Sequence, residues 1–177
     1  MIKPPQDREV RRALEEFSAP NPLTVESLFA VIVRDYHRPL DLLRGECPLP
    51  GLHANALWLT RPHLPSDAIW LDSALTGSAE VHSLAHEYGH ILLGHQPVIL
   101  PTDPEPEPEY ELLSADFLGG CLLGRARSQD GPSDPLYQRY ETQAEDFAYL
   151  LRRKAADQAR DTRYQADPLL DRLHRSL

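Results

Sequence analysis

His86-Glu87-Tyr88-Gly89-His90 places two imidazole side chains four residues apart, with a carboxylate directly after the first. Residues four apart lie on one face of a helix, so both rings can reach one point and share a metal ion. Glu87 then stands beside that ion as a general base. The stretch has the HExxH pattern of zinc hydrolases, and it favours a metal-binding helix over a solvated helix that is merely rich in histidine.

The residues around this stretch repeat with the period of a helix. Apolar positions recur at steps of three and four and form one stripe: Val81, Leu84, Ala85, Tyr88, Ile91 and Leu92. At about 100° per residue, His86 and His90 fall about 150–170° from the middle of the stripe. We therefore expect both histidines to face away from the core that the stripe packs against.

Candidate caps flank the predicted helix. Ser78, or Thr76 just upstream, can cap its amino end, and Gly94 can close its carboxyl end. Gly89 in the middle of the helix costs about 1 kcal/mol relative to alanine. We therefore expect another element to pack closely against Gly89.

A catalytic zinc ion normally has three protein ligands and leaves a fourth position for water, so a third ligand is expected. Residues 140–155 again repeat helically and carry Glu141 and Glu145. Glu141 is about 70° from the centre of the apolar stripe and Glu145 about 110°, which favours Glu141 as the ligand. Glu145, one turn later, can hold the second nitrogen of a ligand imidazole. The alternative is that both are solvated carboxylates.

Two segments carry recognisable motifs. The segment 82–95 has His82, HEYGH and a Leu-Leu-Gly-His tail, and the segment 141–148 has the pattern ExxAxxFA. Together the two motifs resemble the ImmA/IrrE family of metallopeptidases. The likeness covers roughly residues 25 to 155 and is to short bacterial members found beside repressor genes. It implies a zincin-like fold in which His86, His90 and Glu141 bind one Zn²⁺ per chain. By the same resemblance Glu87 is the catalytic base.

The resemblance also implies a function. It is that of a zinc-dependent metalloendopeptidase that cleaves a regulatory protein, such as a helix-turn-helix DNA-binding repressor. A different class of function is a non-cleaving module on the same fold, which sequesters a regulator or pairs with a toxin or antitoxin. Glu87 argues for the enzyme, because sequestration requires no base beside two metal ligands.

The rest of the chain predicts an α+β fold. A short helix is expected at 7–17, and a second begins at the cap Thr24, with Leu23 and Leu28 flanking its first turn, and ends near Tyr36. Three strand candidates follow, at 39–43, 54–60 and 68–72. We expect helices packed on a small, mainly antiparallel three-stranded sheet.

Proline and acidic residues fill the segment 96–111, which excludes a helix or a central strand there. A solvated acidic loop is the first interpretation, and a lid over the substrate groove is the alternative. A helix is expected within 112–123. Residues 1–160 form one predicted domain, and 161–177 a polar tail with a short helix that opens at Asp167-Pro168.

Composition indicates a cytoplasmic protein. The 177 residues contain no apolar run long enough to span a membrane, and the first residues lack the apolar core of a signal peptide. Two cysteines, Cys47 and Cys121, are too few for a disulfide framework. The net charge of −9 argues against direct binding of nucleic acid, which needs a basic surface.

Other polar residues carry weaker expectations. His82, one turn before His86, is either a hydrogen-bonded structural residue or a group that polarises a substrate carbonyl. His95 stands where the helix ends, and the helix dipole favours a cation there. Tyr140, Tyr137 and Tyr110 are candidate donors to a developing oxyanion, and the sequence does not choose among them.

Overall fold

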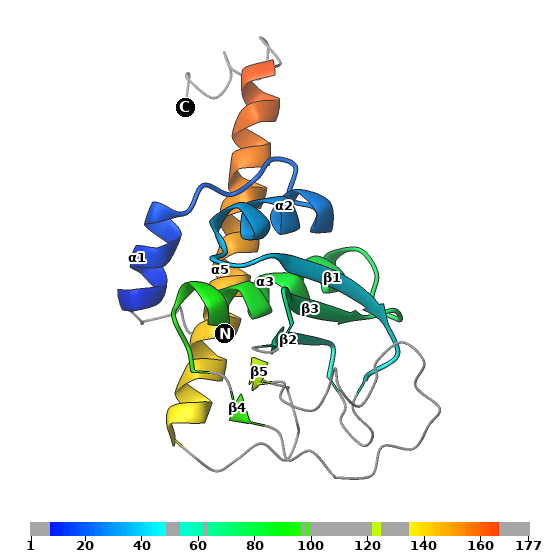
Figure 1. Cartoon of the computed structure of the whole chain (residues 1–177). Coiled ribbons are helices and arrows are strands. Elements are labelled where there is room, and N and C mark those ends of the chain that lie inside the picture. Colours follow the sequence, from blue (N-terminus) through cyan, green and yellow to red (C-terminus); the bar gives the residue numbers. More distant parts are fainter. Residues whose placement is uncertain are drawn as a thin grey trace.

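The computed structural model describes residues 8–48, 54–61, 64–96, 98–99, 122–124 and 135–166. The fold is α+β, as the sequence predicts. Its elements are α1 (Arg8–Glu16), α2 (Val25–Asp35), β1 (Leu40–Gly45), β2 (Ala56–Thr60), β3 (Asp67–Asp72), α3 (Ser78–Leu92), β4 (Val98–Ile99), β5 (Leu122–Gly124) and α5 (Pro135–Ala166). Figure 1 shows the helices gathered on one side of the sheet and α5 running along the whole molecule.

The three predicted strands form, but they are not a simple antiparallel sheet. The strand order is β1-β3-β2-β5-β4, and β1 runs parallel to β3 with Leu40 opposite Asp67. The other three pairings are antiparallel. The chain reverses between β1 and β2 and again between β2 and β3, so β1 and β3 run in the same direction. The sheet is therefore mixed.

The prediction of a helix within 112–123 is wrong for the residues of this segment that the structure describes. Leu122 and Leu123 belong to β5, which pairs with β2 on one side and β4 on the other. Pairing with β2 satisfies backbone groups that would otherwise form an open sheet edge, and this outweighs local helix preference. The remainder of the segments 96–111 and 112–123, and the tail helix predicted after Asp167, lie outside the described residues.

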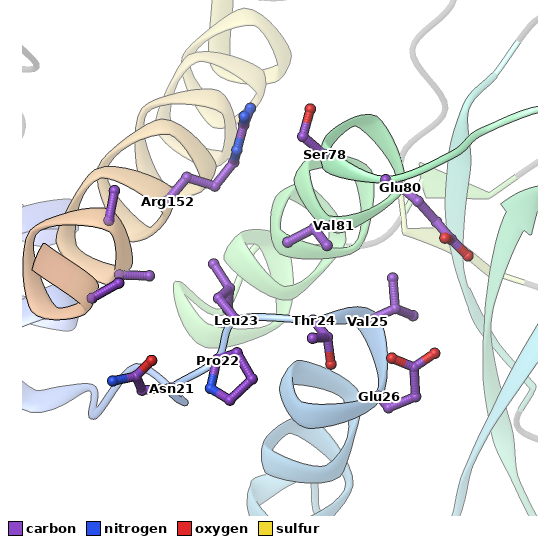
Figure 2. A pocket seen from close by; sticks show the side chains of 14 residues that line it. Asn21, Pro22, Leu23, Thr24, Val25, Glu26, Ser78, Glu80, Val81 and Arg152 are labelled. Carbon is purple, nitrogen blue, oxygen red and sulfur yellow. The ribbon is translucent and has the colours of Figure 1, made fainter. Parts of the chain in front are cut away.

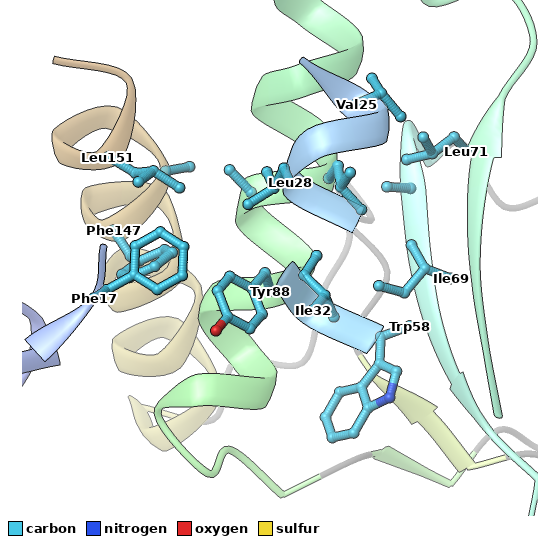
Figure 3. Close-up of a cluster of buried hydrophobic side chains, with 14 of the residues drawn as sticks. Phe17, Val25, Leu28, Ile32, Trp58, Ile69, Leu71, Tyr88, Phe147 and Leu151 are labelled. Carbon is cyan, nitrogen blue, oxygen red and sulfur yellow. The ribbon is translucent and has the colours of Figure 1, made fainter. Parts of the chain in front are cut away.

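The main core lies between the sheet and the helices (Figure 3). Alternate residues of β2 and β3, such as Trp58 and Ile69, face this core, while their neighbours Leu57 and Trp70 belong to a second buried cluster. This alternation is the period-2 pattern of a strand buried on both faces. On the helical side, α3 packs between the sheet and α5.

Aromatic residues join three helical segments in this core. The ring of Tyr88, on α3, meets Phe17 at 5.4 Å and Phe147, on α5, at 5.8 Å, both edge to face. The Nζ atom of Lys154 on α5 donates hydrogen bonds to the carbonyl oxygens of Leu14 and Phe17, at 2.6 and 2.7 Å. These contacts satisfy the carboxyl end of α1 and fix it against α5.

Helix ends follow the sequence in part. The predicted cap Thr24 is confirmed, and Ser27 completes a capping box with it. For α3, the cap is neither Ser78 nor Thr76 but Gly77, whose φ of 57° lets the chain turn into the helix. Gly94, with φ of 66°, closes the far end as predicted. In the part of the chain that the structure describes, no helix is both long and apolar enough to cross a membrane.

The expected close contact at Gly89 is confirmed. A Cβ atom at Gly89 would lie 3.2 Å from Cα of Ala144 and 3.2 Å from Cδ1 of Phe147, both on α5. Such distances are shorter than ordinary van der Waals contact, so α3 and α5 approach each other closely only because residue 89 has no side chain.

Gly89→Ala should therefore destabilise the protein despite the better helix propensity of alanine. The propensity gain is about 1 kcal/mol, whereas overpacking a core costs about 1–3 kcal/mol. Chemical denaturation should show a net loss of stability. Gly45→Ala is the matched control, because the nearest atom to its Cβ would be Nε1 of Trp70 at 4.0 Å. A Gly89→Ala variant as stable as the parent would contradict the packing account.

Candidate metal centre

α3 and α5 bring the three predicted ligands together. The Nε2 atoms of His86 and His90, one turn apart on α3, are 3.1 Å from each other. From α5, Glu141 places Oε2 3.5 Å from Nε2 of His86 and Oε1 3.5 Å from Nε2 of His90. One donor atom from each residue lies within 4.8 Å of the other two. The group could hold a metal ion.

The spacing of the donors fits such an ion. Two donors bound at 2.0–2.1 Å around a tetrahedral metal are separated by about 3.3 Å. The separations of 3.1, 3.5 and 3.5 Å among the three side chains bracket this value. Two imidazole nitrogens and a carboxylate oxygen also form a donor set that zinc accepts.

Both histidines are buried, which the angle from the apolar stripe does not predict. His86 is 8% exposed and His90 is 0% exposed, and every residue from Ser83 to His90 is buried. Leu84, Ala85 and Tyr88 of the stripe lie in the main core, where Tyr88 also meets Phe147 of α5. Glu141, from the same helix α5, approaches both histidines on their own side of α3. The stripe alone could not reveal this second packing surface.

Carboxylates surround His86. Glu145, on α5, has Oε2 3.6 Å from Nδ1 of His86 and 3.3 Å from Nε2 of His82. Burial lowers the pKa of His86, but the hydrogen-bonding carboxylates of Glu141 and Glu145 raise it by more, and the pKa rises to about 9. The raised pKa favours the protonated imidazole, and a metal ion bound at Nε2 would displace that proton.

Glu87 is buried beside the same group. It is 2% exposed, and the backbone N–H of Trp58 on β2 donates a 2.9 Å hydrogen bond to its Oε2. Burial raises the pKa of Glu87 to about 8; the charge of His86 opposes this shift and that of Glu141 adds to it. A carboxyl group with such a pKa can exchange protons near neutral pH, as a general acid or base must.

A buried polar network holds the strand that contacts Glu87. The indole Nε1 of Trp58 donates to Oη of Tyr36 at 3.2 Å, and Tyr36 donates to Oδ2 of Asp67 at 2.6 Å. Arg38 pairs with Asp67 at 2.9 Å, and the backbone N–H of Arg61 donates to the same carboxylate at 2.8 Å. Asp67 is 1% exposed, so these partners offset the cost of burying its charge.

The sequence places His95 only at the end of the helix, and it does not single out Gln143. His95 lies at the helix end but is buried, 4% exposed, with Nδ1 2.9 Å from Nδ1 of His90 and Nε2 3.0 Å from Oε1 of Gln143. Gly94 is the sequence feature that could have indicated the position of His95. Its left-handed conformation directs the N–H of His95 to the carbonyl of His90 at 3.0 Å and the N–H of Gly94 to that of Ile91 at 3.1 Å. This Schellman motif folds His95 back onto the helix.

The other residues that the sequence analysis names differ in their surroundings. His82 is hydrogen-bonded to Glu145 and has Nδ1 3.5 Å from Arg152. Tyr140 stacks on His95, with ring centroids 4.2 Å apart. Tyr137 is buried, Cys47 is half-buried and unpaired, and Tyr110 and Cys121 lie outside the described residues.

A hollow of about 540 Å³ lies elsewhere, beside the first turns of α2 and α3 (Figure 2). Leu23, Val25, Val81 and alanines of α5 line it, together with Glu26 and Arg152. His86, His90 and Glu141 are not among its lining residues, so its volume gives no measure of the metal site. A second hollow, of about 450 Å³, is lined in part by His95, Tyr140 and Gln143.

Comparison of the chain with models of protein families, with curated proteins and with solved structures finds no match. A function for this chain is therefore inferred from the site itself.

The raised pKa values predict how stability depends on pH when metal is removed by a chelator. The pKa of His86 rises from 6.5 to about 9, and the pKa of Glu87 rises from 4.5 to about 8. Between about pH 4.5 and 9, these two groups therefore bind more protons in the folded chain than in the unfolded chain. Stability should be greatest at the acidic end of this window and fall as pH rises through it. Urea denaturation at pH 6 and pH 9 measures the difference.

Glu87→Gln removes one of the two titrating groups and should flatten this dependence. His37→Gln, at an exposed position, is the control and should keep the parent's pH dependence. A chelated parent protein that is more stable at pH 9 than at pH 6 would contradict the assigned protonation states.

Proposed function

We propose that the chain is a zinc-dependent metalloendopeptidase. The observation that carries the proposal is the burial of Glu87 directly beside a group of three metal-binding side chains. Glu87 is 2% exposed, and burial raises its pKa to about 8. Burying a carboxyl group without function costs stability, so its position argues for a role in proton transfer.

Zinc is the metal that the donor set favours. Catalytic zinc sites commonly combine two histidines with one carboxylate and keep a further position for water or substrate. His86, His90 and Glu141 supply that combination. When bound, zinc supplies a water molecule of lowered pKa and polarises the carbonyl group of a substrate.

The chain's own residues then handle the proton. Glu87 accepts a proton from the attacking water as the new C–O bond forms, and it returns the proton to the departing nitrogen as the C–N bond breaks. The N–H of Trp58 holds Oε2 of Glu87 in place throughout, since β2 is fixed in the sheet. The low exposure of the site strengthens these electrostatic interactions.

The substrate class comes from the resemblance to ImmA/IrrE metallopeptidases and not from the site. We propose a regulatory protein, such as a helix-turn-helix repressor, as the substrate, in the cytoplasm of a bacterium. A chain that sequesters such a regulator without cutting it is the competing function, and Glu87 distinguishes the two.

Glu87→Gln should abolish cleavage and leave the metal bound. The amide cannot accept a proton from water, so the rate should fall by roughly 100-fold or more. Incubation with a proteome-derived peptide library, followed by mass spectrometry of the cleaved bonds, measures the activity, and zinc analysis measures the metal. Glu80→Gln is the matched control, because Glu80 lies on the same helix and pairs with Arg44.

Loss of cleavage with zinc retained, in Glu87→Gln but not in Glu80→Gln, supports the peptidase. Equal cleavage by Glu87→Gln and the parent would overturn the assigned role of Glu87. A zinc-loaded parent that cuts no bond in the library would favour the sequestering function.

A further inference from the structure

A chain of polar contacts leads from the surface to one of the two histidines of the metal centre. Nδ1 of His90 lies 2.9 Å from Nδ1 of His95, and Nε2 of His95 lies 3.0 Å from Oε1 of Gln143. The amide nitrogen of Gln143 then donates a 2.9 Å hydrogen bond to Oε2 of Glu9 on α1. His90, His95 and Gln143 are 0%, 4% and 3% exposed.

The direction of each hydrogen bond follows from the group at the outer end. An ionised carboxylate only accepts, so Glu9 requires the amide nitrogen of Gln143 to face it. The amide oxygen therefore faces His95, and the proton in that contact resides on Nε2 of His95. A neutral imidazole carries a single N–H, so Nδ1 of His95 is an acceptor. The N–H in the last contact therefore belongs to Nδ1 of His90.

This order of protons leaves the lone pair of His90 on Nε2. The same Nε2 lies 3.1 Å from Nε2 of His86 and 3.5 Å from Oε1 of Glu141, at the point where the three donors converge. The opposite tautomer would place a hydrogen atom at that point and prevent binding of a metal ion. The identity of the tautomer thus decides whether His90 can be a ligand.

We propose that His95 and Gln143 are positioning residues that fix the Nδ1–H tautomer of His90 and so prepare it to bind metal. The inference rests on the proposed metal centre and gives a role to two residues outside the HEYGH stretch and outside the three proposed ligands. A hydrogen bond to the outer nitrogen also fixes the ring orientation of a ligand histidine and increases its basicity.

The fold builds this chain from three separate segments. The Schellman motif at Gly94 returns His95 to the last turn of α3, and the ring of Tyr140 stacks on it at 4.2 Å. Gln143 comes from α5, two residues after Glu141. Glu9 comes from α1, where Arg139 also approaches its Oε2 at 3.4 Å. The packing of α1 and α5 therefore bears on the protonation pattern at His90.

The test compares two changes at Gln143. Gln143→Leu removes the acceptor for His95 with little change of volume, and a loss of zinc affinity of roughly 10–100-fold is expected. The double variant Glu9→Gln with Gln143→Glu restores the order of donors and acceptors with the two groups exchanged, and it should bind zinc within about threefold of the parent. Competition with a chromogenic chelator measures both affinities.

A second readout uses protein from which metal has been removed. Long-range ¹H–¹⁵N correlation spectra of the histidine rings distinguish the Nδ1–H from the Nε2–H tautomer. His90 should be Nδ1–H in the parent and in the double variant, and a mixture of both forms in Gln143→Leu. Glu9→Ala changes an exposed residue and lets the Gln143 amide rotate, so the Nε2–H tautomer of His90 should appear in this variant too. The test therefore does not depend on the folding of Gln143→Leu.

Unchanged zinc affinity and an unchanged His90 tautomer in Gln143→Leu and Glu9→Ala would overturn the positioning role while the proposed metal centre stands. Loss of affinity in the double variant equal to that in Gln143→Leu would also overturn it, because a structural defect would then explain both. A parent chain that binds no zinc would instead overturn the proposed function, and the spectra would still report the tautomer.

Discussion

The close contact between α3 and α5 at Gly89 and Ala144 is the constraint on which the site depends. With 3.2 Å between a Cβ at Gly89 and Cα of Ala144, the two helix backbones nearly touch. Glu141 lies one turn before Ala144, and this approach brings its carboxylate to 3.5 Å from both histidines. A larger residue at position 89 would separate the helices and the donors together. The packing of these two helices therefore sets the geometry of the candidate metal site.

The same packing gathers polar groups in a place where water is scarce. Glu87, His90, His95 and Gln143 are each less than 5% exposed, and their burial is favourable only because each has a defined partner. Trp58 holds Glu87, and His95 holds His90. A cation at the centre of this group would bind the folded state alone and stabilise it. The site is therefore expected to link metal content to folding.

Much of this could be predicted from the sequence, because the decisive signals are local. The HEYGH spacing, the helical period of 140–155 and the glycine at 89 are enough to predict two helices in close contact, with Glu141 near the histidines. Three strand candidates were also correct. Parallel pairing of β1 with β3 and the strand β5 depend on long-range contacts, and no local period encodes these. The network around Asp67 escaped prediction for the same reason.

Zinc titration of the parent chain beside Glu141→Ala and Glu145→Ala tests the central claim most directly. The parent should bind one zinc ion per chain. Glu141→Ala should lose nearly all affinity, because a donor of the metal is gone, whereas Glu145→Ala should lose roughly 10–100-fold, because Glu145 only approaches Nδ1 of His86. A parent that binds no zinc, or a Glu141→Ala variant that binds it as tightly as the parent, would contradict the account.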